Sequence, residues 1–410
     1  MNARKILCLM AAVLMLSGCS KGGDGSQASS KAAESSGKAN SSVSDYDNTT
    51  TEPETDKPEF DLNDSVIGFS QESGFYDSGF SLELTANEGE KIYYTTDGTD
   101  PRASATREEY TAPIEIKDRS NDPNVVSAVP TEMISGNFNE FSFGEGDFWC
   151  NKKAPSDNAV DKCTVIRASS EKSDGSVSKS FSGSFYIGSA EHIKGLKESC
   201  EAAGHDLAVM NITMDYADLF DSKIGIYVKG DIFSKALEDY KSGGESIENE
   251  TARQLDANYK QRGKEWERDC HIELNEISAE GIVTNALSQD CGIRIQGNYS
   301  RSDLQKGFRL YARKKYGEKK FNYEVFEGLK NASDETIDSF KTLTLRAGGN
   351  CAFTAKFNDT YWQSLMTELD GSTKASRPCV VYLNGEYWGL YVLEEDYSDN
   401  YFESHYGVNK

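Results

Sequence analysis

The sequence predicts two folded regions of different class, an all-β sandwich followed by a larger α+β domain. From about residue 59 to 188, apolar and polar residues alternate and turn signals recur, as in short half-buried strands. From 189 to 410, helical periodicity is interspersed with strand-like segments. Aromatic residues make up 11% of the 410-residue chain, which is enough to build hydrophobic cores. We therefore expect a multidomain protein.

Residues 1–19 have the features of a cleaved signal peptide. Two basic residues precede the apolar run Ile6 to Leu16, which is shorter than the about 20 apolar residues that span a bilayer. The run ends in Leu16-Ser-Gly-Cys19, which resembles the lipobox of bacterial lipoproteins. The resemblance implies that Cys19 is lipidated and becomes the new N-terminus. An ordinary signal peptide with a nearby cysteine is the alternative. We expect an extracytoplasmic protein anchored to the cell membrane through its lipid.

Residues 20–58 form a second N-terminal segment, rich in Ser, Gly, Ala, Lys, Asp and Thr. Such a composition buries too little apolar surface to offset the entropy of ordering, so we expect a disordered linker. The whole chain carries a formal charge of −23, which repels phosphate backbones and argues against a nucleic-acid partner. The scattered cysteines include no CxxC pair and only four His are present, so a zinc site has little support. Cys150 and Cys163 either form a disulfide or remain two unpaired thiols, and the sequence leaves both alternatives open.

The predicted sandwich occupies residues 59–188. Its clearest strands are Phe80 to Leu84, Lys91 to Thr96, Val165 to Ala168 and Phe181 to Ile187, and Asp174-Gly175 separates the last two. The stretches Ser73 to Tyr76 and Ile92 to Pro101, with Tyr110 and Pro113-Ile114, resemble the chitobiase/β-hexosaminidase C-terminal module. That resemblance implies an immunoglobulin-like accessory sandwich. Its aromatic residues are either a glycan-binding surface or sandwich core; they are Tyr76, Tyr93, Tyr94 and Trp149.

A basic hairpin is the most informative part of the second domain. Gly292 to Gln296 and Gln305 to Arg313 alternate as two strands, with a glycine-containing turn between them. Arg301, Lys306 and Arg309 beside that glycine predict a cradle for an anion such as phosphate. The alternative is that the hairpin needs the glycine in any case and the bases are a solvated face.

Further elements follow toward the C-terminus. Phe340 to Arg346 is predicted to be a strand that ends in the tight turn Ala347 to Asn350. Thr354 to Leu369 is predicted to be an amphipathic helix, with an apolar stripe of Phe357, Tyr361, Leu365 and Leu369. Asn384-Gly385 predicts a tight hairpin between two apolar strands.

These strings together resemble the spore coat protein H (CotH) kinase family over about 218 to 410. The matching stretches are Gly225 to Gly230, Gly292 to Arg313, Leu343 to Asn350 and Val380 to Glu395. The resemblance implies a protein-kinase-like fold of atypical design that binds ATP with Mg²⁺ or Mn²⁺. It also implies phosphoryl transfer to a surface or cell-wall protein. No residue is assigned as a metal ligand.

By motif position, the resemblance gives cofactor-binding roles to a small set of residues. Arg301, Lys306, Arg309 and Arg346 are the cations for the phosphates, and Glu395 or Asp359 is the acidic partner of one of them. Two departures from the family are Cys351, where Asp is common, and Asn358-Asp359, where Arg-Asp is common.

The family's catalytic base and metal carboxylates have no counterpart here and are expected beyond Lys410. We therefore expect a C-terminally incomplete kinase-like domain with little or no kinase activity in this form. A non-catalytic surface scaffold that binds a protein or glycan is the competing hypothesis, and a glycosidase is a third.

Overall fold

A computed structural model describes most of the chain beyond the N-terminal segments. The described residues are 59–129, 155–188, 198, 207–243, 254–277, 283–352, 355–367, 369 and 371–408. The predicted signal peptide, Cys19, the linker, Trp149 and Cys150 lie outside them, as does most of 189–206. Within the described residues, none of the helices has the length and apolar content that crossing a membrane requires.

The N-terminal described part is a small β-sandwich. Its main sheet has the order β2-β9-β8-β5-β6, and two strand pairs, β3-β7 and β1-β4, accompany it. The bounds are β1 Gly68–Phe69, β2 Gly74–Tyr76, β3 Phe80–Leu82, β4 Leu84–Thr85, β5 Lys91–Thr95, β6 Glu108–Glu109, β7 Ile114–Ile116, β8 Thr164–Glu171 and β9 Phe181–Ile187. The core between them includes Leu82, Ile116, Ile166 and Phe185. The predicted sandwich is confirmed, although the expected strand at 80–84 is two short strands.

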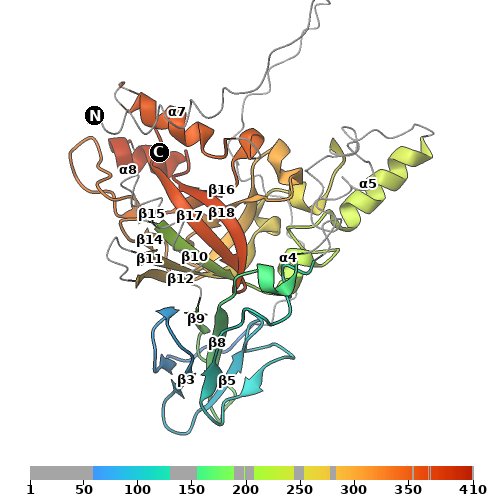
Figure 1. Cartoon of the computed structure of the whole chain (residues 1–410), viewed down its shortest axis with the longest axis vertical. Coiled ribbons are helices and arrows are strands. Elements are labelled where there is room, and N and C mark those ends of the chain that lie inside the picture. Colours follow the sequence, from blue (N-terminus) through green and yellow to red (C-terminus); the bar gives the residue numbers. More distant parts are fainter. Residues whose placement is uncertain are drawn as a thin grey trace, which may run out of the picture. The chain divides into compact units, whose positions relative to one another are not determined.

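The second domain is built on a closed β-barrel with the strand order β10-β11-β12-β13-β16-β18-β17 (Figure 1). All neighbouring strands are antiparallel except β10 and β17, whose parallel pairing closes the barrel. The bounds are β10 Leu207–Thr213, β11 Arg268–Ile277, β12 Val283–Gln296, β13 Gly307–Tyr311, β16 Thr342–Arg346, β17 Ser376–Leu383 and β18 Glu386–Glu394. A separate pair is β14 Phe321–Asn322 with β15 Ser339–Phe340.

Strand β10 is buried on both faces, which explains why its sequence is mostly apolar, with Asn211 and Thr213 as the polar exceptions. Ala208, Met210 and Ile212 join the barrel core. Leu207 and Val209 instead join a second apolar cluster that also contains sandwich residues such as Val165 and Tyr186. Because successive side chains of a strand point to opposite faces, β10 has the barrel core on one side and the sandwich on the other.

The Asn384-Gly385 turn fastens the β17–β18 hairpin to the rest of the chain. Both residues have positive φ, at 48° and 79°, as the predicted tight hairpin requires. The Asn384 side chain accepts a hydrogen bond from Met214 N and donates one to Met214 O, each at 2.8 Å. Gly385 O accepts a bond from Cys163 N of the sandwich at 2.7 Å. A Cβ at Gly385 would lie 2.5 Å from Cys163 O, so only glycine fits.

The described helices are few and lie between or after the barrel strands. They are α4 Tyr216–Phe220, α5 Gly230–Ser242, α7 Asn358–Met366 and α8 Asp399–Tyr406, with 3₁₀ turns η1 Asp157–Ala159, η2 Asn258–Lys260, η3 Lys264–Trp266, η4 Tyr299–Ser302 and η5 Gly349–Cys351. Helices α7 and α8 lie at the same end of the barrel (Figure 1). The predicted apolar stripe of α7 is not a core face, since α7 contains no buried residue. Phe357, Leu365 and Leu369 are exposed, and none of them belongs to a core cluster of the described residues.

Candidate functional site

A pocket of about 530 Å³ lies at one end of the barrel, which is a volume typical of small-molecule sites. Its wall comes from four places in the chain: the end of β12 with the turn after it, the start of β13, the end of β16 with the turn after it, and the start of α7. Its lining residues are Gln296, Gly297, Asn298, Tyr299, Ser300, Gly307, Arg346, Ala347, Gly348, Gly349, Cys351 and Asp359. The β12 and β16 turns, about fifty positions apart in the sequence, therefore meet at one site, because their strands are joined through β13 in the barrel.

Glycines with positive φ shape both turns of the pocket. Gly297 ends β12 with φ 111°, and a Cβ there would lie 2.4 Å from Ser300 Oγ. Gly348 follows β16 with φ 106°, and a Cβ there would lie 2.8 Å from Ala352 Cα. Neither position tolerates a side chain, so the backbone itself forms part of the pocket wall.

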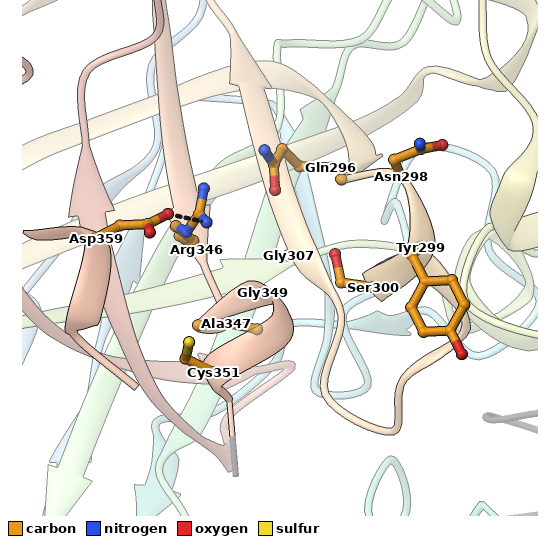
Figure 2. A pocket seen from close by; sticks show the side chains of 12 residues that line it. Gln296, Asn298, Tyr299, Ser300, Gly307, Arg346, Ala347, Gly349, Cys351 and Asp359 are labelled. Atoms are coloured by element: carbon orange, nitrogen blue, oxygen red, sulfur yellow. Dashed lines mark hydrogen bonds and ion pairs between the residues drawn. The ribbon is translucent and has the colours of Figure 1, made fainter. Parts of the chain in front are cut away.

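Arg346 and Asp359 form the charged side of the pocket. The Arg346 guanidinium donates a hydrogen bond to Asp359 Oδ2, and the two side chains are 26% and 49% exposed. Figure 2 shows them directed toward one another, with Ser300 and Tyr299 on the other side of the pocket. Because both side chains are partly exposed, a ligand can reach them. An exposed ion pair of this kind contributes only about 0–1 kcal/mol to stability.

Arg301 and Lys306, both predicted to bind phosphate, lie in the protein interior. Arg301 is 5% exposed, and its guanidinium donates to the carbonyl oxygens of Gly297 at 2.6 Å and Gln261 at 2.9 Å. Lys306 is fully buried, where its Nζ donates to Asp303 O at 2.6 Å and lies 4.3 Å from the ring centroid of Tyr259. Arg301 therefore stabilises the Gly297 turn through its hydrogen bond to the Gly297 carbonyl oxygen. Lys306 has no exposed surface. Their predicted cofactor-binding roles remain predictions.

Arg309 and Glu395 do not line the pocket, and each contacts other residues. Arg309 Nη2 lies 3.0 Å from Asp396 Oδ1. Glu395 is 3% exposed, accepts a bond from Ala375 N at 2.9 Å, and lies 2.8 Å from His405 Nε2. Of the six residues predicted to bind the cofactor, Arg346 and Asp359 are the two that line the pocket.

Two further residues matter for the pocket and were not singled out from the sequence. Tyr299 lines the pocket and is 44% exposed. Lys356 Nζ donates to Ala347 O at 2.7 Å and to Gln305 Oε1 at 2.5 Å, and so holds the turn after β16. Burial lowers the pKa of Lys356. No sequence signal points to Lys356, whereas Tyr299 lay inside the predicted turn.

A second arginine–carboxylate cluster surrounds Glu267, the residue just before β11. Glu267 has no exposed side-chain surface and lies 2.8 Å from Arg294 Nη2 and 3.1 Å from Arg313 Nε. Tyr316 donates its hydroxyl hydrogen to Glu267 at 2.9 Å. Burial alone would raise the pKa of Glu267, but Arg294 and the other cations hold it below its usual value. This cluster is a structural network.

The described part of the chain contains no group of three or more His, Cys, Asp or Glu residues placed to hold a metal ion. The carboxylate in the pocket lining is that of Asp359. Mg²⁺ is commonly held by only one or two protein carboxylates together with the phosphates of a nucleotide. Asp359 therefore fits a metal ion that arrives with a nucleotide, although it would not hold one alone.

The sandwich tyrosines are partly buried, as core residues would be. Tyr76 and Tyr94 pack against the sandwich core. Tyr93 is covered by Arg107, whose guanidinium carbon lies 4.2 Å from the ring centroid. These contacts favour the core interpretation for Tyr76 and Tyr94, and glycan binding stays a prediction.

Two protein-family models match the chain. The model described as CotH kinase protein matches residues 293–410, and the model described as Chitobiase/beta-hexosaminidase C-terminal domain matches residues 71–130. No curated protein matches the chain. The CotH match includes every lining residue of the pocket but begins inside β12, so the closed barrel extends beyond the matched segment. The chain thus carries a chitobiase/β-hexosaminidase C-terminal domain followed by a CotH-type domain with a β-barrel.

Proposed function

We propose that the pocket between the β12 and β16 turns binds ATP, and that the CotH-type domain is built for transfer of the terminal phosphoryl group to a surface protein. We expect this 410-residue form to transfer it weakly or not at all, because Asp359 is the one carboxylate among the lining residues. The observation that carries this proposal is Arg346 at the wall of a nucleotide-sized pocket, beside a turn whose two glycines leave the backbone accessible. The guanidinium fork of arginine matches phosphate geometry and forms charge-assisted hydrogen bonds with it. The match to the CotH kinase family supports the same ligand.

Asp359 gives the site a built-in dependence on a divalent cation. In the absence of a ligand, its carboxylate neutralises Arg346. An incoming phosphate competes with Asp359 for the guanidinium, and the two anions repel one another. Mg²⁺ or Mn²⁺ would neutralise the phosphates and supply the charge that phosphoryl transfer requires. Asp359 would then turn from Arg346 toward the metal.

Tyr299 is the proposed platform for the nucleotide base. It lies across the pocket from Arg346 (Figure 2) and is 44% exposed. Stacking of a base on an aromatic side chain contributes about 1–3 kcal/mol in single-stranded nucleic-acid complexes. Gln296 and Asn298 place amide groups in the same wall, and amides pair well with the polar edge of adenine.

We also propose that this domain lies outside the cytoplasm, anchored through lipidated Cys19; the lipobox-like sequence Leu16 to Cys19 supports this proposal. Expression in a bacterial host with an alkyne-labelled fatty acid would test the anchor. The label should enter the chain and the chain should sediment with membranes. Cys19→Ser should lose both properties, and equal labelling of the two forms would contradict the anchor.

Calorimetric titration of the chain with ATP, with and without Mg²⁺, tests the binding proposal. Arg346→Gln should weaken ATP binding by about 10- to 100-fold, because a hydrogen bond to a charged group contributes about 1.5–3 kcal/mol. The matched control is Arg107→Gln, which breaks a half-exposed arginine–glutamate pair in the sandwich instead. Tyr299→Ala should weaken ATP but leave tripolyphosphate binding unchanged.

Absence of ATP binding by the unmodified chain would leave the non-catalytic scaffold as the better reading. Transfer is tested separately, by incubation with ATP labelled on its terminal phosphate and extracted surface proteins. Label in a protein band that disappears with Arg346→Gln supports transfer.

A further inference from the structure

Two cysteines face each other across adjacent barrel strands. Cys270 on β11 is directly opposite Cys291 on β12 in the antiparallel register, and their sulfur atoms are 3.5 Å apart. Directly opposed residues of an antiparallel pair have Cα atoms about 4.5–5.5 Å apart, which lies within the range that a disulfide spans. A small rotation of the side chains is therefore enough to bring the sulfurs to bonding distance.

Both thiols belong to the barrel core. Cys270 is 4% exposed and Cys291 is fully buried. Burial raises the pKa of the Cys291 thiol, which disfavours the thiolate that thiol–disulfide exchange needs. Oxidation is therefore slow once the barrel has closed, and a bond formed earlier is protected from external reductants by the same burial.

We propose that Cys270 and Cys291 are a disulfide-forming pair, oxidised while the barrel folds. One thiolate attacks a sulfur of an oxidised disulfide, either of a protein oxidant or of a small thiol, and releases one thiol. The second cysteine then attacks the mixed disulfide and releases the other. The pair loses two protons and two electrons, and the oxidant is reduced to two thiols.

The bond would fix the register of β11 on β12. Strand β12 runs on from Cys291 to Gln296, where the pocket turn begins. Cross-linking also restricts the unfolded chain, which favours the folded state. The proposed location outside the cytoplasm supplies an oxidising environment, and the pairing itself follows from the strand register alone.

Refolding in a mixture of oxidised and reduced glutathione tests the pair without any nucleotide. After alkylation of free thiols in denaturant, trypsin should release Asp269–Arg294 as one peptide, because no lysine or arginine lies inside it. That peptide should lack alkyl groups and weigh two hydrogens less than its reduced form. A glutamate-specific protease, cutting at Glu273, Glu276 or Glu280, should leave its two halves joined through sulfur.

Single substitutions provide matched controls. Cys379→Ser removes another buried barrel thiol and should leave the linked peptide intact. Cys270→Ser should make Cys291 fully alkylatable after unfolding. The oxidised protein should melt at a higher temperature than the reduced one, and Cys270→Ser should abolish that difference.

Two alkyl groups on the Asp269–Arg294 peptide after oxidative refolding would overturn the proposal. So would Cys270 or Cys291 linked to a different cysteine, or an oxidised form that melts no higher than the reduced form. None of these outcomes depends on ATP binding, so the disulfide and the nucleotide site succeed or fail separately.

Discussion

The CotH-type domain contains two arginine–carboxylate pairs of the same chemistry that differ in how much solvent reaches them. Arg294 meets Glu267 where the carboxylate has no exposed surface, and Arg313 and Lys315 surround the same carboxylate. Arg346 meets Asp359 at a pocket wall, where both side chains are partly exposed. The first pair is enclosed by protein, whereas the second borders a cavity.

This difference separates a structural cation from a ligand-binding one. A buried charge cannot lose its partner without a large desolvation cost, so Arg294 is committed to Glu267. Water can solvate Arg346 when Asp359 moves away, so an incoming phosphate can replace the carboxylate at small cost. A basic residue therefore indicates an anion site only when its side chain is exposed enough to exchange one anionic partner for another.

The largest expected effect is on the buried pair. Glu267→Gln should destabilise the chain by about 3–5 kcal/mol, because it leaves Arg294 buried without a neutralising charge. Urea denaturation followed by circular dichroism measures this loss. Tyr316→Phe is the milder companion, since it removes one hydrogen bond to Glu267 and should cost about 1 kcal/mol. A loss below 1 kcal/mol for Glu267→Gln would mean that the cluster is solvated.

The buried pair also predicts how stability depends on pH. The folded-state pKa of Glu267 lies below its ordinary value of 4.5, despite the opposing effect of burial, because Arg294 and its neighbouring cations favour the carboxylate. Its contribution is therefore fully present above pH 4.5 and is lost as the pH falls through the lower, folded-state pKa. Urea midpoints measured across this range should fall more steeply for the unmodified chain than for Glu267→Gln. Parallel slopes would contradict the assignment.

Much of the fold was predictable because its signals are local. Strand periodicity, the Asn384-Gly385 turn and the glycine-ended strands before the pocket depend on neighbouring residues. Burial depends on contacts that are distant in sequence. Nothing local distinguishes Lys306, which is enclosed by Tyr227 and Tyr259, from Arg346, which borders the pocket.

The same reasoning explains the residues that the sequence did not reveal. Lys356 supports the pocket through Ala347 O, a contact that exists only after α7 folds back toward β16. Cys270 and Cys291 became a pair only once the register of β11 on β12 was known. Periodicity fixes which face a residue occupies, but it does not identify the residue opposite.

The pocket pair predicts an intermediate effect, on binding and not on folding. Asp359→Asn should change stability by no more than about 1 kcal/mol, because the pair is partly exposed. It should also strengthen ATP binding in metal-free buffer, because Arg346 no longer has a competing carboxylate. The gain in affinity on adding Mg²⁺ should shrink. Calorimetric titrations of both proteins, with and without the metal, measure these changes.

Equal losses of stability for Asp359→Asn and Glu267→Gln would contradict the proposed difference between the two pairs. If Asp359→Asn unfolded the chain, or weakened metal-free ATP binding, Asp359 would be a structural partner of Arg346. The two pairs would then have the same role despite their different exposure.

The smallest expected effect is on stability and concerns an exposed leucine of α7, the helix that also contains Asp359. Leu365 is 40% exposed and Leu345, in the barrel, is fully buried. Leu365→Ala should change stability by less than about 0.5 kcal/mol, whereas Leu345→Ala should cost about 2–5 kcal/mol. Urea denaturation measures both. A loss above about 2 kcal/mol for Leu365→Ala would show that this face is covered in solution, and whatever covers it would then also constrain Asp359 at the pocket.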